Sequence, residues 1–209
     1  MSQAVRRVGL MGGSFNPIHM GHLFVAQEAL SKFNLQRIIF VPAYRNPFKT
    51  DEYWKREMAT PQQRLAMIEL AISTNPDFFV SSFELDRNMP SYTLDTLKHF
   101  KGELGEESQL YFITGTDAVI SMPHWNGIGE FHKYCEIIAA TRPSFIPDYE
   151  AFLAKANELE LKVYFITIPA LEISSREIRS RARRGLPVRY LTPTAVAVYI
   201  EKHGIYRKE

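Results

Sequence analysis

Short apolar runs alternate with amphipathic helical patterns along this chain, and this alternation is what most restricts its fold. Six runs rich in Ile, Val, Phe or Tyr have the length of buried strands. They span Val8–Met11, Ile38–Val41, Phe78–Phe83, Leu110–Thr114, Ile137–Ala140 and Val163–Ile168. Helical patterns separate most of the runs. The chain is therefore predicted to be an α/β protein with a doubly wound, mostly parallel sheet, which binds ligands outside the carboxyl ends of its strands.

One predicted helix carries a full set of start signals. Thr60 is a candidate N-cap, Pro61 occupies the first helical position and Gln63 the third, which together form a capping-box pattern. Only helical patterns follow the last predicted strand, so residues 170–209 are predicted to form a C-terminal helical cap. Further helical patterns cover residues 17–33, 92–100, 147–160 and 174–185.

Length and cysteine content restrict the organisation of the chain. It has 209 residues, enough for one hydrophobic core, and no repeat or low-complexity tract divides it, so we expect a single domain over residues 1–209. Cys135 is the only cysteine, which excludes an intramolecular disulfide and a cysteine-rich zinc site. The N-terminal apolar run is too short for a signal peptide or a membrane span. A cytoplasmic protein with no membrane partner is expected.

Basic residues concentrate in one window of an otherwise balanced chain. The net charge is +2, but the segment from Ser174 to Arg189 contains six arginines and one acid, a local charge of +5. Such a segment suits an anionic partner. Nucleic acid is the less favoured choice, because the window lacks interleaved aromatic residues that stack on bases. The arginines are Arg176, Arg179, Arg181, Arg183, Arg184 and Arg189.

A turn rich in glycine and histidine follows the first predicted strand. Residues 12–23 read GGSFNPIHMGHL, which places small residues where an α/β fold binds phosphate on backbone N–H groups. Neither the dinucleotide fingerprint G-x-G-x-x-G nor a P-loop is present. His19 and His22 can aim at one point and could be general bases, metal ligands or donors to phosphate, or simply a core pair. Gly21 between them indicates a close approach of another group, and a zinc site would lack a third ligand.

The turn and a second motif together resemble a known superfamily. GGSFNPIHMGHL is similar to the signature of the H-x-G-H nucleotidyltransferases, and ISSREIR, residues 173–179, resembles their second signature, commonly I-S-S-T-x-I-R. Within this superfamily the chain most resembles bacterial nicotinate-nucleotide adenylyltransferases, over nearly its whole length. Three residues depart from the family pattern, namely Asn16 for Asp, Phe48 for His and Arg176 for Thr. Matching segments include NPFKT, FELDRNMPSYTLDTL, YFITGTDAVISMPHW, Arg142-Pro143 and RYLTPTAVAVYIEKHGIY.

The resemblance implies a Rossmann-like fold and a reaction. Enzymes of this family join ATP and nicotinate mononucleotide, and release pyrophosphate, with Mg²⁺ bound mainly by phosphate and water. The same reaction on nicotinamide mononucleotide, or on phosphopantetheine, stays open. A nucleic-acid-binding module is the alternative from another class.

The resemblance also implies roles for individual residues. The catalytic residues it implies are His19, His22 and Arg179, and it implies no protein ligand for a metal. The ATP-binding residues it implies are Gly12, Gly13, Ser14, Phe15, Gly115, Asp117, Ile173, Ser174 and Ser175. The mononucleotide-binding residues it implies are Asn16, Lys49, Ser91, Tyr92, Thr93 and Trp125. Without the resemblance, Lys49 could be solvated surface, Trp125 a core residue, and the Ser and Asp residues helix caps.

Overall fold

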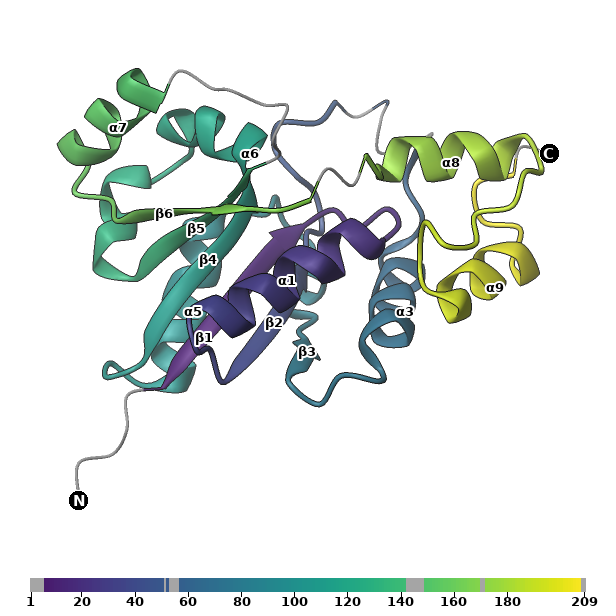
Figure 1. The fold of residues 1–209 in the computed structure, drawn as a ribbon, viewed down its shortest axis with the longest axis horizontal. Helices are drawn as coiled ribbons and strands as arrows, with labels where there is room; N and C mark the ends of the chain where they lie inside the picture. Colours follow the sequence, from purple (N-terminus) through teal and green to yellow (C-terminus); the bar gives the residue numbers. More distant parts are fainter. Residues whose placement is uncertain (1–5, 51, 53–56, 142–148, 170–171, 208–209) are drawn as a thin grey trace. The chain divides into compact units, whose positions relative to one another are not determined.

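A single parallel sheet is the framework of the fold. A computed structural model describes residues 6–50, 52, 57–141, 149–169 and 172–207, and of residues 116–117 and 149–152 it describes the backbone alone. The strand order is β3-β2-β1-β4-β5-β6, with all strands parallel (Figure 1). This confirms the predicted doubly wound α/β fold. The strands are β1 Arg7–Gly13, β2 Arg37–Pro42, β3 Phe78–Val80, β4 Gln109–Gly115, β5 Cys135–Thr141 and β6 Val163–Thr167.

Helices connect the strands much as the capping signals predict. Before α3, the Thr60 hydroxyl accepts a bond from Gln63 N at 3.2 Å, and the Gln63 side chain accepts one from Thr60 N at 2.9 Å, so the capping box is confirmed. The α-helices are α1 Met20–Lys32, α3 Pro61–Ile72, α4 Phe83–Arg87, α5 Thr93–Leu104, α6 Thr116–Ser121, α7 Tyr149–Glu158, α8 Ser175–Arg183 and α9 Thr194–Lys202. The 3-10 helices are η1 Met122–His124 and η2 Ile128–Lys133.

The predicted end of the third strand was wrong. The apolar run predicts a strand through Phe83, but β3 ends at Val80 and Phe83 begins α4. The Ser81 hydroxyl accepts a bond from Phe83 N at 3.3 Å, and the Ser82 hydroxyl bonds to the Asp86 carboxylate at 2.6 Å. These local serine contacts turn the backbone away from the sheet and into the helix.

The chain divides into two compact units. Unit 1 comprises Met1–Gly12, Val25–Ile39 and Tyr92–Leu171, and unit 2 comprises Gly13–Phe24, Phe40–Ser91 and Glu172–Glu209. In unit 1 the apolar residues of β4 and β5 are almost completely buried, as expected for strands covered on both faces. β1 pairs in parallel with β4, and β4 with β5, so their carboxyl ends lie along one edge.

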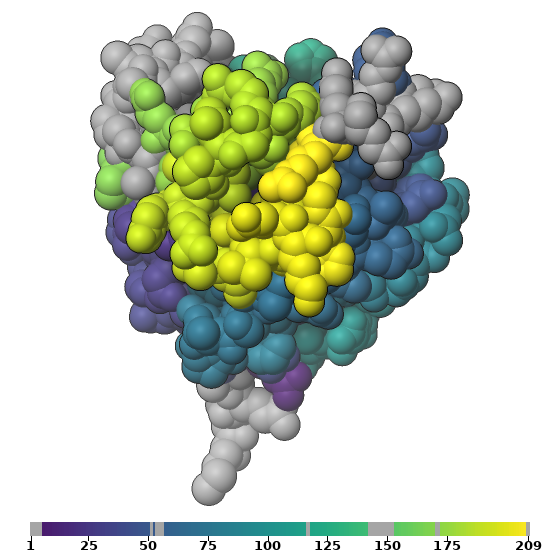
Figure 2. Space-filling model, turned by 90° about the vertical axis from the view of Figure 1, so that its right-hand side faces the viewer, coloured from purple at the N-terminus to yellow at the C-terminus, as the bar shows by residue number. Residues whose placement is uncertain are grey.

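Unit 2 carries the C-terminal helices. No strand follows β6 in the described residues 172–207, which agrees with the predicted helical cap. α9 contacts α3, and Figure 2 shows the C-terminal residues packed against one another. The last turn of α8 is followed by Gly185, whose φ of 68° is the left-handed conformation of a helix C-terminus. The helix therefore ends where the sequence predicts.

Candidate active site

Hydrogen bonds to two carbonyl groups at the turn after β1 set the direction of the neighbouring N–H groups. The Gly13 carbonyl accepts a bond from Ala43 N at 2.8 Å, and the Ser14 carbonyl accepts one from Arg64 Nη1 at 2.9 Å. Because the N–H and C=O of a trans peptide unit point in opposite directions, the N–H groups of Ser14 and Phe15 point away from these partners. Adjacent N–H groups directed in this way form a cradle for an anion.

Phe15 lies at the base of this turn in a strained conformation. Its φ is 43°, and its side chain is only 2% exposed. A bulky residue with positive φ is uncommon and is found where surrounding packing enforces it, often at functional sites. The Phe15 ring packs edge to face on Phe40, with centroids 5.8 Å apart, and on His22, at 5.1 Å. A Cβ at Gly13 would lie 3.2 Å from this ring, so glycine leaves room for it.

The two histidines of the turn form one unit. Their rings stack with centroids 3.6 Å apart and planes inclined by 26°. The backbone N–H of His19 donates to Nδ1 of His22 at 3.2 Å, so a neutral His22 ring carries its hydrogen on Nε2. His19 is buried, whereas His22 is partly exposed. His22 is thus arranged to donate a hydrogen bond through Nε2.

Gly21 leaves room for the His19 ring beside the second signature. A Cβ on Gly21 would lie 3.2 Å from the His19 ring and 4.0 Å from the Ile173 carbonyl oxygen. Any larger residue would therefore press on the His19 ring. This accounts for the glycine between the histidines.

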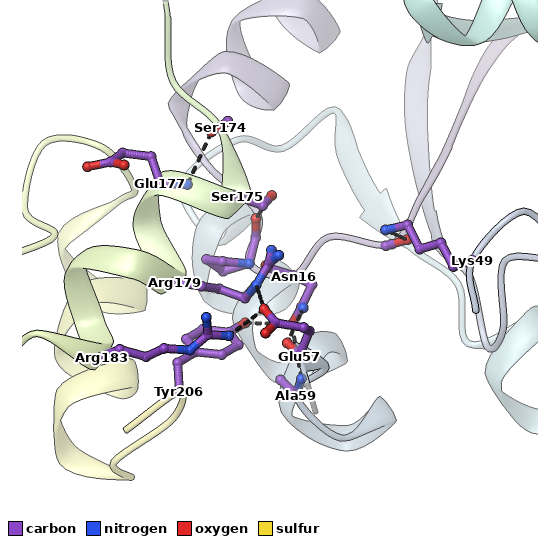
Figure 3. A network of polar contacts seen from close by, with 12 residues as sticks. Asn16, Lys49, Glu57, Ala59, Ser174, Ser175, Glu177, Arg179, Arg183 and Tyr206 are labelled. Carbon is purple, nitrogen blue, oxygen red and sulfur yellow. Dashed lines mark hydrogen bonds and ion pairs between the residues drawn. The ribbon is translucent and has the colours of Figure 1, made fainter. Parts of the chain in front are cut away.

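The start of α8 is capped and bonded to the turn (Figure 3). The Ser174 hydroxyl accepts a bond from Glu177 N at 3.1 Å, which confirms an N-cap at this position. The Ser175 hydroxyl donates to the Pro17 carbonyl at 2.8 Å. The two signatures, 158 residues apart in this pair, therefore meet in unit 2. The positive end of the helix dipole and its first N–H groups lie at this junction.

Arg179 bonds to the turn and to an acid that sequence reasoning missed. It is only 5% exposed, and it donates to the Asn16 carbonyl at 2.9 Å and to Glu57 Oε2 at 3.3 Å. Arg183 donates to the same carboxylate oxygen (Figure 3). The hydrogen bond from Arg183 holds the pKa of the Glu57 carboxyl below its usual value, and the hydrogen bond from Arg179 lowers this pKa by a smaller amount. No local signal in the sequence could have indicated Glu57, because its arginine partners lie 122 and 126 residues away along the chain.

Both polar atoms of the Asn16 amide group are bonded to the protein. Its Oδ1 accepts bonds from Ala59 N at 3.0 Å and from the Tyr206 hydroxyl at 2.7 Å. Its Nδ2 donates to the Glu57 carbonyl at 2.7 Å. Sequence reasoning did not indicate these partners, and a contact between Asn16 and a mononucleotide stays a prediction.

Cationic side chains gather at the turn. Lys49 donates to the Ser14 hydroxyl at 3.1 Å, and Arg64, only 1% exposed, donates to the Ser14 carbonyl and to the Tyr44 carbonyl. Sequence reasoning missed Arg64, although an arginine on the apolar face of α3 was a usable signal. With Arg179, these groups give the turn a positive environment that favours a polyanion.

Two predicted ATP contacts lie in unit 1 at strand ends. β1 and β4 are parallel neighbours, with Met11 opposite Ile113, so Gly12 and Gly115 follow at the same carboxyl edge. A Cβ on Gly12 would lie 3.3 Å from the Phe112 ring. Asp117 belongs to the first turn of α6, but its side chain lies outside the described part of the chain.

The residues predicted to bind the mononucleotide fall in both units. In unit 2, the Ser91 hydroxyl accepts a bond from Tyr44 N at 2.9 Å, in the loop that also carries Lys49. In unit 1, Tyr92 is the N-cap residue of α5 and Thr93 its first residue. Their positions match the predicted helix start.

Trp125 follows η1 in unit 1 and is partly exposed. Its Nε1 donates to the Ser121 hydroxyl at 3.3 Å, and its ring packs edge to face on Phe112 and Phe131. The ring is therefore packed against two aromatic side chains of the protein. Arg142-Pro143 of the matching segments lies outside the described residues.

A divalent metal ion generally accompanies catalysis in adenylyltransferases. Among the residues that the structure describes, no group of three or more His, Cys, Asp and Glu side chains is arranged to hold one.

No helix in the described part of the chain is long and apolar enough to cross a membrane.

Comparison with known proteins places this chain in one class. A model of the cytidylyltransferase-like family matches residues 10–181, which include both signatures. The chain belongs to this family and, within it, to the nicotinate-nucleotide adenylyltransferases, as its relatives over the full length indicate.

Two bacterial relatives illustrate the similarity. A protein of Thermoanaerobacter sp. (strain X514), described as a probable nicotinate-nucleotide adenylyltransferase, is 44% identical over 205 residues, covering 97% of this chain and 95% of its own. A Thermus thermophilus protein with the same description is 41% identical, covering 96% of this chain and 100% of its own. The Plasmodium falciparum nicotinic acid mononucleotide adenylyltransferase complexed with NaAD has the same fold, with a TM-score of 0.76 at 23% identity, over 96% of this chain and 97% of its own.

Proposed function

We infer that this protein transfers the adenylyl group of ATP to nicotinate mononucleotide, giving nicotinic acid adenine dinucleotide and pyrophosphate. The observation that carries this inference is the junction of the two signatures. At this junction the Ser175 hydroxyl bonds the start of α8 to the turn that presents His19 and His22. Relatives of matching length are named for this activity.

The reaction needs positioned donors more than a base. An oxygen of the mononucleotide phosphate attacks the α-phosphorus of ATP, a new phosphorus–oxygen bond forms, and the bond to pyrophosphate breaks. The attacking phosphate is already an anion at neutral pH, so catalysis depends on alignment and on stabilising the charge of the transferring group. His22 donates through Nε2 to the α-phosphate, and His19 serves a neighbouring phosphate oxygen.

The rest of the ATP site follows from the same contacts. The N–H groups of Ser14 and Phe15 and the start of α8 receive phosphate oxygens, with Arg179 assigned to the β- and γ-phosphates. The protein contacts of Arg179 support a second role in holding the turn. The further residues assigned to ATP are Gly12, Gly13, Gly115, Asp117, Ile173, Ser174 and Ser175.

The mononucleotide is assigned to the loop around Lys49 and to the start of α5. Free N–H groups at a helix start favour a carboxylate, which nicotinate has and nicotinamide lacks. The residues assigned to it are Asn16, Lys49, Ser91, Tyr92, Thr93 and Trp125. The bond from Lys49 to Ser14 supports a position of Lys49 between the two substrates.

We assign Mg²⁺ as the divalent ion. Lys49, Arg64 and Arg179 at the turn are cations, which fit phosphate oxygens, and the nearby Glu57 carboxylate already bonds to Arg179 and Arg183 rather than to a metal ion. The triphosphate and water would hold the ion, which when bound neutralises phosphate charge. One domain over residues 1–209 and a cytoplasmic location complete the proposal, the latter supported by the single cysteine.

A pyrophosphate-release assay tests the function directly. Purified protein receives ATP and Mg²⁺ with nicotinate mononucleotide, nicotinamide mononucleotide or phosphopantetheine in parallel. Release with the nicotinate form, well above the other two, is expected. Release only with another acceptor would replace the substrate assignment, and release with none of them would overturn the function.

A further inference from the structure

Asn16 is the centre of a hydrogen-bond network that joins three distant segments of unit 2 (Figure 3). It is 1% exposed, and its amide bonds to Glu57, Ala59 and Tyr206. The partners lie 41, 43 and 190 residues away along the chain. The turn is thus attached through one side chain both to the segment before α3 and to the end of the chain.

The backbone partners fix the orientation of this amide. Ala59 N can only donate, and the Glu57 carbonyl can only accept, so Oδ1 must face Ala59 and Nδ2 must face Glu57. The Tyr206 hydroxyl, also bonded to Oδ1, is therefore the donor in its bond. An aspartate at this position would place a second carboxylate oxygen against the Glu57 carbonyl, where two acceptors repel.

Tyr206 itself is held by the segment that follows α9. Ile205 is buried, and its N–H donates to the Ile200 carbonyl at 3.0 Å. Arg207 N donates to the Gly204 carbonyl at 3.1 Å, on the other side of Tyr206. The φ of Tyr206 is 71°, a conformation that a tyrosine adopts only when its surroundings enforce it. The backbone that carries the phenol is therefore held in place where the phenol bonds to Asn16.

We propose that Tyr206 is a positioning residue for adenylyl transfer, acting through Asn16 on the turn that presents the phosphate donors. The proposal rests on the function inferred above. Asn16 comes two residues after Ser14 and three before His19, so a shift of Asn16 displaces both the N–H cradle and the histidine pair. When the phenol hydroxyl is lost, Oδ1 keeps its bond to Ala59 N, so the network loosens without leaving a buried acceptor unsatisfied.

The test compares Tyr206→Phe with a matched control, Tyr199→Phe. Tyr199 lies on α9 with its ring against His203, and no bond from its hydroxyl is found among the described residues. Pyrophosphate release gives kcat and the KM for ATP. The kcat is divided by the concentration of binding sites, which is measured by titration with a non-hydrolysable ATP analogue. Hydrogen exchange of peptides covering residues 12–23 reports the turn without requiring activity.

The expected result is a fall in kcat of about fivefold for Tyr206→Phe, the equivalent of one net hydrogen bond, with a much smaller change in KM. Exchange across residues 12–23 accelerates in Tyr206→Phe and not in Tyr199→Phe. A role confined to stability would lower the fraction of binding-competent protein and leave kcat per site unchanged. Equal kcat values in the two variants, or equal exchange, would overturn the proposal. If the unaltered protein releases no pyrophosphate, the function is wrong, and the exchange comparison still decides the link to the turn.

A double variant tests whether the effect passes through Asn16. The side chain in Asn16→Ser is too short to reach the phenol, so adding Tyr206→Phe to it is expected to lower kcat no further. Additive losses would show that Tyr206 acts by another route. The comparison with Tyr199→Phe decides the proposal if Asn16→Ser fails to fold.

Discussion

Replacing His22 tests the assigned chemistry at a single atom. The bond from His19 N to Nδ1 leaves Nε2 as the donor of the neutral ring. His22→Ala removes that donor, and loss of one preorganised donor to a transferring group lowers kcat about 10²–10³-fold. This corresponds to roughly 3–4 kcal/mol of transition-state stabilisation at about 1.36 kcal/mol per factor of ten. KM for ATP is expected to change far less, because the donor acts mainly on charge that develops in the transition state.

Two further substitutions separate donation from support of the turn. His22→Gln places an N–H donor near the position of Nε2, whereas His22→Asn places an acceptor near Nδ1, where His19 N donates. Donation to phosphate predicts that the glutamine variant keeps more activity than the asparagine variant, which resembles His22→Ala.

Single-turnover pyrophosphate release measures these rates, with His99→Ala as the control. His99 pairs with Glu103 on α5, and its removal is expected to leave the rate unchanged. Higher activity in His22→Asn than in His22→Gln would refute the reasoning, because His22 would then act by holding the turn.

Three other predictions concern the N-cap of α8, the ion pair of Glu57 and the burial of Cys135. Ser174→Ala removes the N-cap of α8 and is expected to lower the free energy of unfolding by about 1 kcal/mol, measured by urea denaturation. Glu57 has a lowered pKa, so its contribution to stability is complete above the unfolded value near 4.5 and is lost as pH falls below it. Glu57→Gln should accordingly flatten the acid side of a stability-against-pH curve, and an unchanged curve would contradict the Arg183 pairing. Burial raises the pKa of the Cys135 thiol to about 12, so iodoacetamide should modify it only after unfolding, as mass spectrometry would show.

The elements of this fold that sequence could predict are those set by local signals. The capping box at Thr60 and Gln63 depends on residues three apart, and the helix end at Gly185 on one residue's conformational freedom. Buried strands such as β4 are predictable because β-branched and aromatic runs of that length suit a covered sheet. The exception is Phe83, where neighbouring serines outweighed the apolar run.

The contacts of the site depended on residues that meet only in the folded chain. The H-x-G-H and I-S-S signatures indicate residue types, but nothing local to Asn16 indicates that Tyr206, 190 residues away, donates to it. Likewise, the second signature predicts only a phosphate-binding role for Arg179, whereas burial and the bond to the Asn16 carbonyl make it part of the turn's support. Long-range hydrogen bonding, rather than residue identity, decides these roles.

The fate of labelled ATP tests the central claim of adenylyl transfer most directly. ATP labelled at the α-phosphate, or separately at the γ-phosphate, is incubated with the protein, Mg²⁺ and nicotinate mononucleotide, and the products are separated. Attack at the α-phosphorus predicts that the α label appears in the dinucleotide and the γ label in pyrophosphate. Transfer of the γ label to the mononucleotide, or its release as inorganic phosphate without dinucleotide, would contradict the account.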